Sequence, residues 1–128
     1  MNGDPGLLSV VIPVCNEADN VLPLAREIAA ALRGRGGLEI IFVDDGSTDS
    51  TAEAVRSART EIPEVRLLRH SRRSGQSAAV ASGVRRSRGE WVATLDGDGQ
   101  NDPADFPAML DALGQAGATE PAVRLVMG

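Results

Sequence analysis

Short apolar runs alternate along the chain with segments whose apolar residues recur at helical spacing. Residues 8–14 (LSVVIPV) and 38–43 (LEIIFV) are rich in β-branched side chains and predict buried strands. Between them, apolar residues recur every three or four positions from Val21 to Leu32. This spacing predicts an amphipathic helix that ends at the glycine-rich residues 34–37.

The same alternation continues through the rest of the chain. The other expected elements are a helix opened by a capping box at residues 50–53, a strand at 65–68, a helix at 77–87, a strand at 91–95, a helix opened by Asp102 and Pro103, and a strand at 123–127. Residues 1–128 are expected to form one domain, with residues 1–6 as a loose N-terminal tail. The order predicts the α/β class, with a Rossmann-like, doubly wound, mostly parallel sheet in a three-layer α/β/α arrangement.

Polar residues gather after the expected strands. They lie at residues 15–17 (CNE), 44–49 (DDGSTD), 70–76 (HSRRSGQ) and 96–102 (DGDGQND). The carboxyl ends of parallel strands meet at one edge of a sheet, and open α/β sheets bind their ligands there. The four clusters therefore predict a single binding site.

Composition narrows the chemistry available to that site. All 13 basic residues are Arg, Cys15 is the one cysteine and His70 the one histidine. Lysine chemistry, an intrachain disulfide and a Cys/His zinc cluster are therefore excluded. With 18 acidic residues the net charge is -5, so no nucleic-acid partner is expected. No apolar run approaches the ~20 residues of a membrane helix, and we expect a cytoplasmic location.

Several residues allow a plain structural interpretation. The DDG at residues 44–46 is by itself typical of a turn, His70 of a polar loop, Cys15 of a small buried residue and Trp91 of a core residue.

The DGD at residues 96–98 is different, because two carboxylates flanked by glycine directly after a strand suit a hard divalent cation. An EF-hand loop does not fit, because its sixth position requires Gly and is Asn101, and its twelfth requires Glu and is Pro107.

Four ordered motifs resemble family 2 glycosyltransferases with the GT-A fold. They are VIPVCNE at residues 11–17, IFVDDGSTD at 41–49, GQSAA at 75–79 and LDGDGQNDP at 95–103. The last motif is most similar to the branch that uses polyprenyl phosphates, such as the dolichol-phosphate mannosyltransferases. Members of the family run well past the fifth strand, so the resemblance implies that this chain is a donor-binding half without the acceptor-binding half.

The resemblance implies a site for a UDP- or GDP-linked sugar, with Mg²⁺ or Mn²⁺ as the cofactor. The residues it implies in nucleotide or substrate binding are Pro13, Asn16, Glu17, Asp44, Asp45, Arg73, Gly75, Gln76, Asp96 and Gly97, with Asp44 and Asp45 on the base and ribose. The implied metal ligands are Asp96, Asp98 and Gln100, and Asp96 and Asp98 are also the implied catalytic residues. A cation that they hold would stabilise the charge of the departing nucleoside diphosphate.

The implied acceptor is a lipid phosphate or another acceptor. A polyprenyl phosphate is already an anion and needs no protein base, and the resemblance places no general base in this chain. The full-length enzyme is expected at the cytoplasmic face of the membrane. A non-catalytic nucleotide-binding or interaction module is the alternative, and a cation-binding α/β domain without a nucleotide is a third reading.

A sheet that stops at residue 127 is expected to associate through its exposed edge, as a homodimer if the contact is two-fold. In the alternative arrangement, residues 123–127 fold back beside the fourth strand and the chain stays monomeric.

Overall fold

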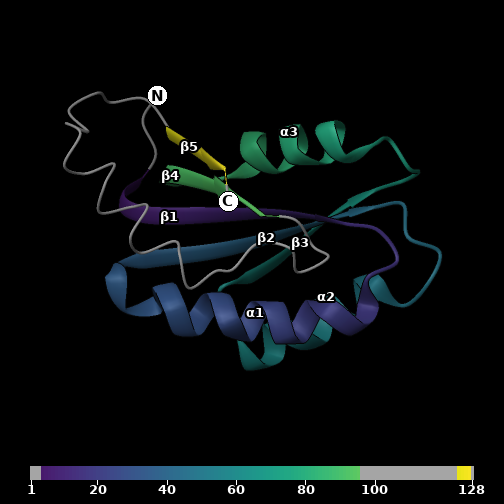
Figure 1. Cartoon of the computed structure of the whole chain (residues 1–128), viewed down its shortest axis with the longest axis horizontal. Helices are drawn as coiled ribbons and strands as arrows, with labels where there is room; N and C mark the ends of the chain where they lie inside the picture. The colour runs from purple at the N-terminus through teal and green to yellow at the C-terminus, as the bar shows by residue number, and fades with distance from the viewer. Residues whose placement is uncertain (1–3, 96–123, 128) are drawn as a thin grey trace.

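The computed structural model of the chain describes residues 4–95 and 124–127. They form a five-stranded parallel sheet in the order β3-β2-β1-β4-β5, with helices on both faces (Figure 1). The strands are β1 (Asp4–Val14), β2 (Gly37–Asp45), β3 (Val65–His70), β4 (Gly89–Thr94) and β5 (Arg124–Met127). The helices are α1 (Ala18–Leu32), α2 (Thr51–Glu61) and α3 (Gln76–Arg86), and a 3₁₀ turn (Arg33–Arg35) follows α1. The predicted α/β class is confirmed.

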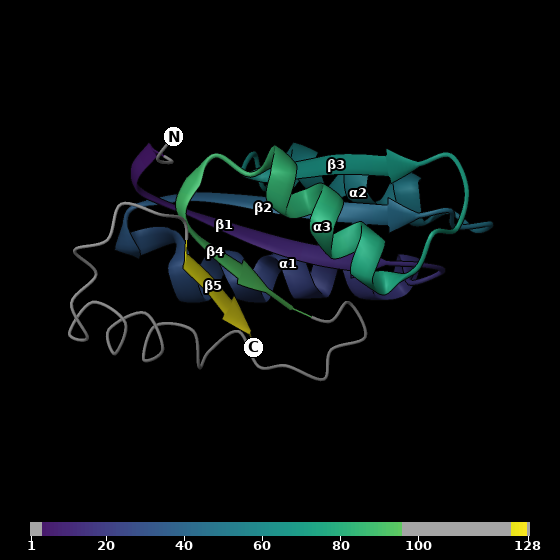
Figure 2. The ribbon, with the colours of Figure 1, turned by 90° about the horizontal axis from the view of Figure 1, so that it is seen from above.

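The sheet separates two apolar layers of unequal size. α1 and α2 cover one face and α3 crosses the other, as Figure 2 shows from above. Because side chains alternate along a strand, β1 supplies both layers: Val10 and Ile12 face α1 and α2, whereas Val11 faces α3. α3 approaches closely because Gly83 has no side chain; a Cβ there would overlap the side chain of Val11.

Two strands extend further at their carboxyl ends than the sequence predicts. β2 continues through Asp45 and β3 through His70, because Asp44 pairs in register with Arg69 and Asp45 with His70. The turn interpretation of residues 44–46 is therefore wrong for both aspartates, and so is the loop interpretation of His70. Both corrections fall at the edge where the site is expected.

The N-terminal tail is shorter than the expected six residues. β1 begins at Asp4, which pairs with Gly89, and the backbone N–H of Gly6 donates to the carboxylate of Glu90 at 3.2 Å. These contacts tie the segment to β4.

The capping box predicted at residues 50–53 is not formed. The side chain of Ser50 makes no capping hydrogen bond, and Glu53 forms an ion pair with Arg56 instead. Asp49, one residue before the N-cap position, supplies an acceptor instead, because its carboxylate accepts the backbone N–H of Thr51 at 2.9 Å. The helix starts where the pattern indicates, with a different residue satisfying its first donor.

The remaining expectations have mixed outcomes. Cys15 and Trp91 are half-buried, and Trp91 packs against the larger apolar layer. Residues 124–127 form β5, which pairs in parallel with β4, and the expected self-association through this edge stays a prediction. The helix expected from Asp102 lies outside the described residues. Within residues 4–95 and 124–127, no helix has both the length and the apolar character needed to cross a bilayer.

Candidate functional site

The strand order reverses beside β1, and this reversal locates the candidate site. The chain steps from β1 to β2 and β3 in one direction, and α3 then returns it to β4 on the other side of β1. Ligands of open α/β sheets bind at such a reversal, beyond the carboxyl ends of the strands. The loops after β1, β2 and β3 meet at this edge.

Pro13 allows β1 and β4 to part at the same edge. The pairing of β1 with β2 runs to Val14 and Asp44, whereas the register of β1 with β4 ends at Val11 and Thr94. The carbonyl of Val11 accepts the N–H of Leu95, so Val11 points its backbone groups toward β4. Pro13, two residues further along β1, also faces β4 but has no N–H to donate. The hydrogen bonds that β1 donates to β4 therefore stop before Pro13.

Asn16 ties the loop after β1 to the loop after β2. Its φ of 56° is a left-handed conformation that Asn tolerates better than most residues. Its side-chain carbonyl accepts the backbone N–H groups of Thr48 at 2.9 Å and Asp49 at 3.2 Å. Its own N–H donates to the hydroxyl of Ser47 at 2.9 Å. The two loops therefore form one connected unit.

Glu17 extends this unit toward two helices. Its backbone N–H donates to the hydroxyl of Thr51, the first residue of α2, at 3.0 Å. Its half-buried carboxylate accepts the side-chain amide of Asn20, in the first turn of α1, at 2.5 Å. The starts of both helices are thus held beside the β1 loop.

Asp45 holds the loop after β3 in place through hydrogen bonds. One carboxylate oxygen, Oδ1, accepts His70 Nδ1 at 2.9 Å and the N–H of Ser74 at 2.8 Å, and Oδ2 accepts the N–H of Gly75 at 2.9 Å. Burial acts to raise the pKa of Asp45, but the hydrogen bonds from His70 and the two backbone groups outweigh it and lower the pKa. The side chain is therefore a carboxylate at neutral pH.

Asp44 is buried on the opposite side of β2. Its Oδ1 accepts the backbone N–H of Ser47 at 3.0 Å, and its Oδ2 lies 3.6 Å from Nε of Arg69 on the neighbouring strand. The two adjacent carboxylates thus hold different loops.

Gly46 brings the loops after β2 and β3 into direct contact. Its φ is +73°, and a Cβ at this position would overlap the backbone nitrogen of Arg73. The side chains of Arg73 and Gln76 are exposed, and Gly75, with φ +102°, leads into α3, which Gln76 opens.

The sequence did not identify His70 as part of this arrangement. Its Nε2 lies 2.8 Å from the hydroxyl of Ser82 in α3, while its Nδ1 contacts Asp45. The trio has the composition of a hydrolytic triad, but the N–H groups around Ser82 are engaged within the helix and offer no oxyanion hole. Extending the two predicted strands to Asp45 and His70 would have shown that these two residues are neighbours.

The predicted metal ligands Asp96, Asp98 and Gln100, together with Gly97, lie outside the described residues. Within residues 4–95 and 124–127, no group of three His, Cys, Asp or Glu side chains is placed to hold a metal ion. Residues 96–98 carry two carboxylates in sequence. Their hard oxygen donors fit Mg²⁺ or Mn²⁺ by chemistry.

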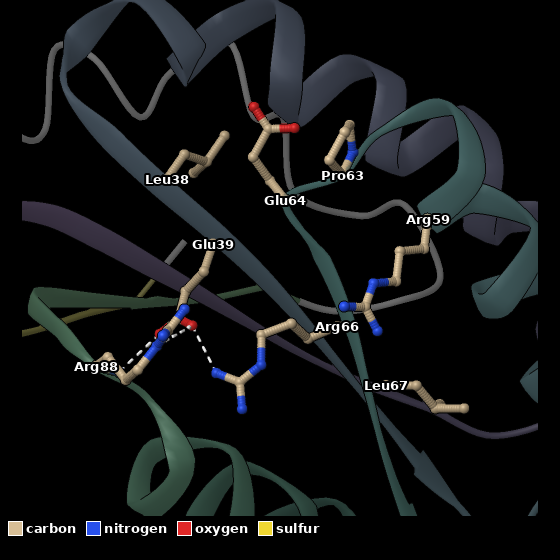
Figure 3. Close-up of a pocket in the computed structure, with 8 residues that line it drawn as sticks. All are labelled: Leu38, Glu39, Arg59, Pro63, Glu64, Arg66, Leu67 and Arg88. Atoms are coloured by element: carbon tan, nitrogen blue, oxygen red, sulfur yellow. Dashed lines mark hydrogen bonds and ion pairs between the residues drawn. The ribbon is translucent and has the colours of Figure 1, made fainter.

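A second polar centre lies at the amino ends of the strands. A groove of about 570 Å³ there is lined by Leu38, Glu39, Arg59, Pro63, Glu64, Arg66, Leu67 and Arg88 (Figure 3). Glu39 is 2% exposed; it accepts the hydroxyl of Ser9 at 2.6 Å, Nη1 of Arg66 at 2.6 Å and the backbone N–H of Arg88 at 2.7 Å. None of the predicted site residues lines this groove, and Glu39 serves to join strands.

The strand reversal and the linked loops define a doubly wound α/β protein with a candidate ligand site at its carboxyl edge. The chain belongs to glycosyl transferase family 2, whose family model matches residues 9–123.

Two curated relatives act on polyprenyl phosphates by name. The chain is 43% identical over 108 residues to a dodecaprenyl-phosphate galacturonate synthase of Rhizobium johnstonii, covering 83% of this chain and 32% of the relative. It is 42% identical over 112 residues to an undecaprenyl-phosphate 4-deoxy-4-formamido-L-arabinose transferase of Pseudomonas paraeruginosa, covering 85% and 33%. The chain therefore spans about a third of the length of these relatives.

A solved structure shows the same fold. The mannosyltransferase PcManGT from Pyrobaculum calidifontis, in complex with GDP-Man and Mn²⁺, matches with a TM-score of 0.68 and 30% identity. The match covers 79% of this chain and 30% of that chain. The predicted GT-A-type fold and family are confirmed.

Proposed function

We propose that this chain is the nucleotide-sugar-binding part of a glycosyltransferase that transfers a sugar to a polyprenyl phosphate. The observation that carries the proposal is the linkage of the loops after β1, β2 and β3 at the strand reversal, through Asn16, Asp45 and Gly46. Support also comes from the mannosyltransferase solved with GDP-Man and Mn²⁺ and from relatives named for polyprenyl phosphates.

The proposed contact of Asp45 uses a lone pair that the loops leave available. Asp45 Oδ2 accepts one hydrogen bond, and a carboxylate oxygen has room for two, so this atom can take an N–H of the base. Pro13, Asn16 and Glu17 line the nucleotide, Asp44 supports its ribose side, and the Arg73–Gly75–Gln76 segment lies nearest the diphosphate. An arginine suits that place because its guanidinium binds phosphate oxygens in pairs.

The carboxylates of Asp96 and Asp98, with Gln100, would hold Mg²⁺ or Mn²⁺, and Gly97 would let the backbone approach the substrate. When bound, the cation stabilises the negative charge that develops on the leaving diphosphate. The acceptor phosphate is itself the nucleophile. The rest of the acceptor site belongs to the longer protein, and the chain by itself is expected to bind the donor without completing transfer.

Calorimetric titration with UDP, GDP and their sugars, with and without Mn²⁺ or Mg²⁺, tests the proposal. We expect metal-dependent binding of one nucleotide, loss of the metal dependence in Asp98→Asn, and weaker binding of the free nucleoside in Asp45→Ala. Failure of the parent chain to bind either nucleotide with either metal would overturn the proposal. A longer chain that binds nucleotide but transfers no sugar to polyprenyl phosphate would favour the non-catalytic module.

A further inference from the structure

Arginines outnumber carboxylates on the α3 side of the sheet. Residues 65–88, which comprise β3, α3 and the segment leading to β4, hold seven of the 13 arginines and none of the 18 acidic residues. Six of the seven lie on the α3 side, because Arg69 pairs with Asp44 on the other side of β2. The opposite face is different, because Arg26, Arg33 and Arg56 each form an ion pair with a glutamate at 2.5–2.7 Å. On that face, these three arginines and Arg69 each have a carboxylate partner, and the exposed Arg59 is the exception among the described residues.

The arginines around α3 are left without such partners. Within residues 4–95 and 124–127, the guanidinium groups of Arg72, Arg73 and Arg86 are exposed and form no ion pair, and Arg85 contacts only the hydroxyl of Ser82, at 3.3 Å. The carboxylates of β2 on this side of the sheet, Glu39 and Asp45, are buried and already have partners: Glu39 pairs with Arg66 and Arg88, and Asp45 accepts hydrogen bonds from His70 and two backbone groups. The positive charge thus faces outward.

The surface between these arginines is apolar and shallow. Arg72 and Arg73 precede α3, and Arg85 and Arg86 end it. The exposed and half-buried apolar residues of the helix between them are small: Ala78, Val80, Ala81 and Val84. Figure 1 shows α3 lying across its side of the sheet with no other labelled helix over it. Small apolar residues framed by long cationic side chains suit the boundary between lipid headgroups and acyl chains.

We propose that the α3 face, defined as Arg72, Arg73, Arg85, Arg86 and the helix surface between them, docks on an anionic phospholipid membrane. The choice of a membrane over other polyanions rests on the proposed function, because the long chain of a polyprenyl phosphate lies in a bilayer. Arg72 and Arg73 follow β3 at the carboxyl edge, so docking through this face brings the candidate site to the membrane surface. The net charge of -5 repels an anionic membrane. Docking therefore requires the protein to turn its positively charged α3 face toward the membrane.

Vesicle co-sedimentation with a matched pair of double variants tests this docking. Arg85→Gln/Arg86→Gln changes the α3 face, whereas Arg56→Gln/Arg59→Gln removes the same charge from α2 on the opposite face. At about 0.1 M salt, the parent should bind vesicles of phosphatidylglycerol and phosphatidylcholine, and release at about 0.5 M salt. The α3 variant should bind roughly 10- to 30-fold more weakly and the α2 variant like the parent.

Other outcomes would overturn the proposal. They are equal losses in the two variants, equal binding to pure phosphatidylcholine, no vesicle binding by the parent, and binding of duplex DNA through the α3 arginines in place of vesicles. Circular dichroism of both variants checks that they remain folded. Nucleotide titration of the same samples keeps the proposals separate, because neither variant alters a residue assigned to the nucleotide site.

Discussion

His70 and Asp45 lie side by side at the carboxyl ends of adjacent parallel strands, with His70 Nδ1 2.9 Å from Asp45 Oδ1. The same carboxylate accepts the N–H groups of Ser74 and Gly75, and the same imidazole contacts Ser82 in α3. One pair of side chains therefore joins the sheet, the turn before α3 and α3 itself.

Replacing His70 should loosen this junction. His70→Ala removes two largely buried hydrogen bonds, and we expect a loss of about 1–3 kcal/mol in the free energy of unfolding. His70→Asn keeps a donor near Asp45 and should recover part of the loss. Urea unfolding of the three proteins measures this, and equal stability of parent and His70→Ala would contradict it.

Acid should weaken the fold through Asp45. Its pKa is lowered in the folded chain, so it stabilises the fold above the unfolded carboxyl pKa of about 3.9, and this contribution is lost as the pH falls through the lower folded pKa. Asp45→Asn should be less stable at pH 7 but lose less stability between about pH 4 and pH 2. Parallel pH profiles for the two proteins would refute this.

Glu39 should matter far more than an exposed glutamate that also pairs with arginine. Glu39→Ala leaves the buried hydroxyl of Ser9 and the backbone N–H of Arg88 without their acceptor, and should cost about 2–6 kcal/mol, at about 1–3 kcal/mol for each group. Glu61→Ala breaks the exposed pair with Arg26, whose side chain is 58% exposed, and should leave the unfolding midpoint nearly unchanged because solvent screens this pair. Similar chemical-denaturation midpoints for the two variants would rule out this role of Glu39.

Gly46 should be required for the shape of the nucleotide site. Gly46→Ala forces a side chain against the backbone of Arg73 in a left-handed conformation, so the loop after β3 must move and nucleotide affinity should fall about tenfold or more. Gly34→Ala is the control, because a Cβ there meets nothing within 4 Å. Calorimetric titration of both variants with the nucleotide measures this effect. Unchanged affinity in Gly46→Ala would show that Gly46 does not shape the nucleotide site.

The β5 edge should mediate self-association. β5 pairs with β4 and is the last strand of the described sheet, so its outer backbone groups can pair with another strand. Light scattering over a dilution series should show a dimer that dissociates in Leu125→Lys. A monodisperse monomer at high concentration would refute the interface.

Periodicity and strand-end chemistry were sufficient to predict the alternating elements, the parallel sheet and the edge that holds the site. They failed where contacts between residues distant in sequence determine the local structure. The DDG at residues 44–46 has turn composition, yet pairing with β3 draws both aspartates into β2. Asp49, and not Ser50, supplies the acceptor at the start of α2 because its carboxylate reaches the backbone N–H of Thr51. No local pattern reports that His70 meets Ser82, since that contact depends on how α3 crosses the sheet.

The buried carboxylate of Glu39 also bears on how the chain folds. Its partners Ser9 and Arg88 are 30 and 49 residues away in sequence, and the hydroxyl of Ser9 accepts the N–H of Gly89, 80 residues away. An intermediate with β1, β2 and β3 assembled but β4 undocked would keep this charge in the sheet with part of its donors missing, at a high energetic cost. Docking of β4 removes that cost, so the centre makes partly formed sheets unstable and folding more cooperative.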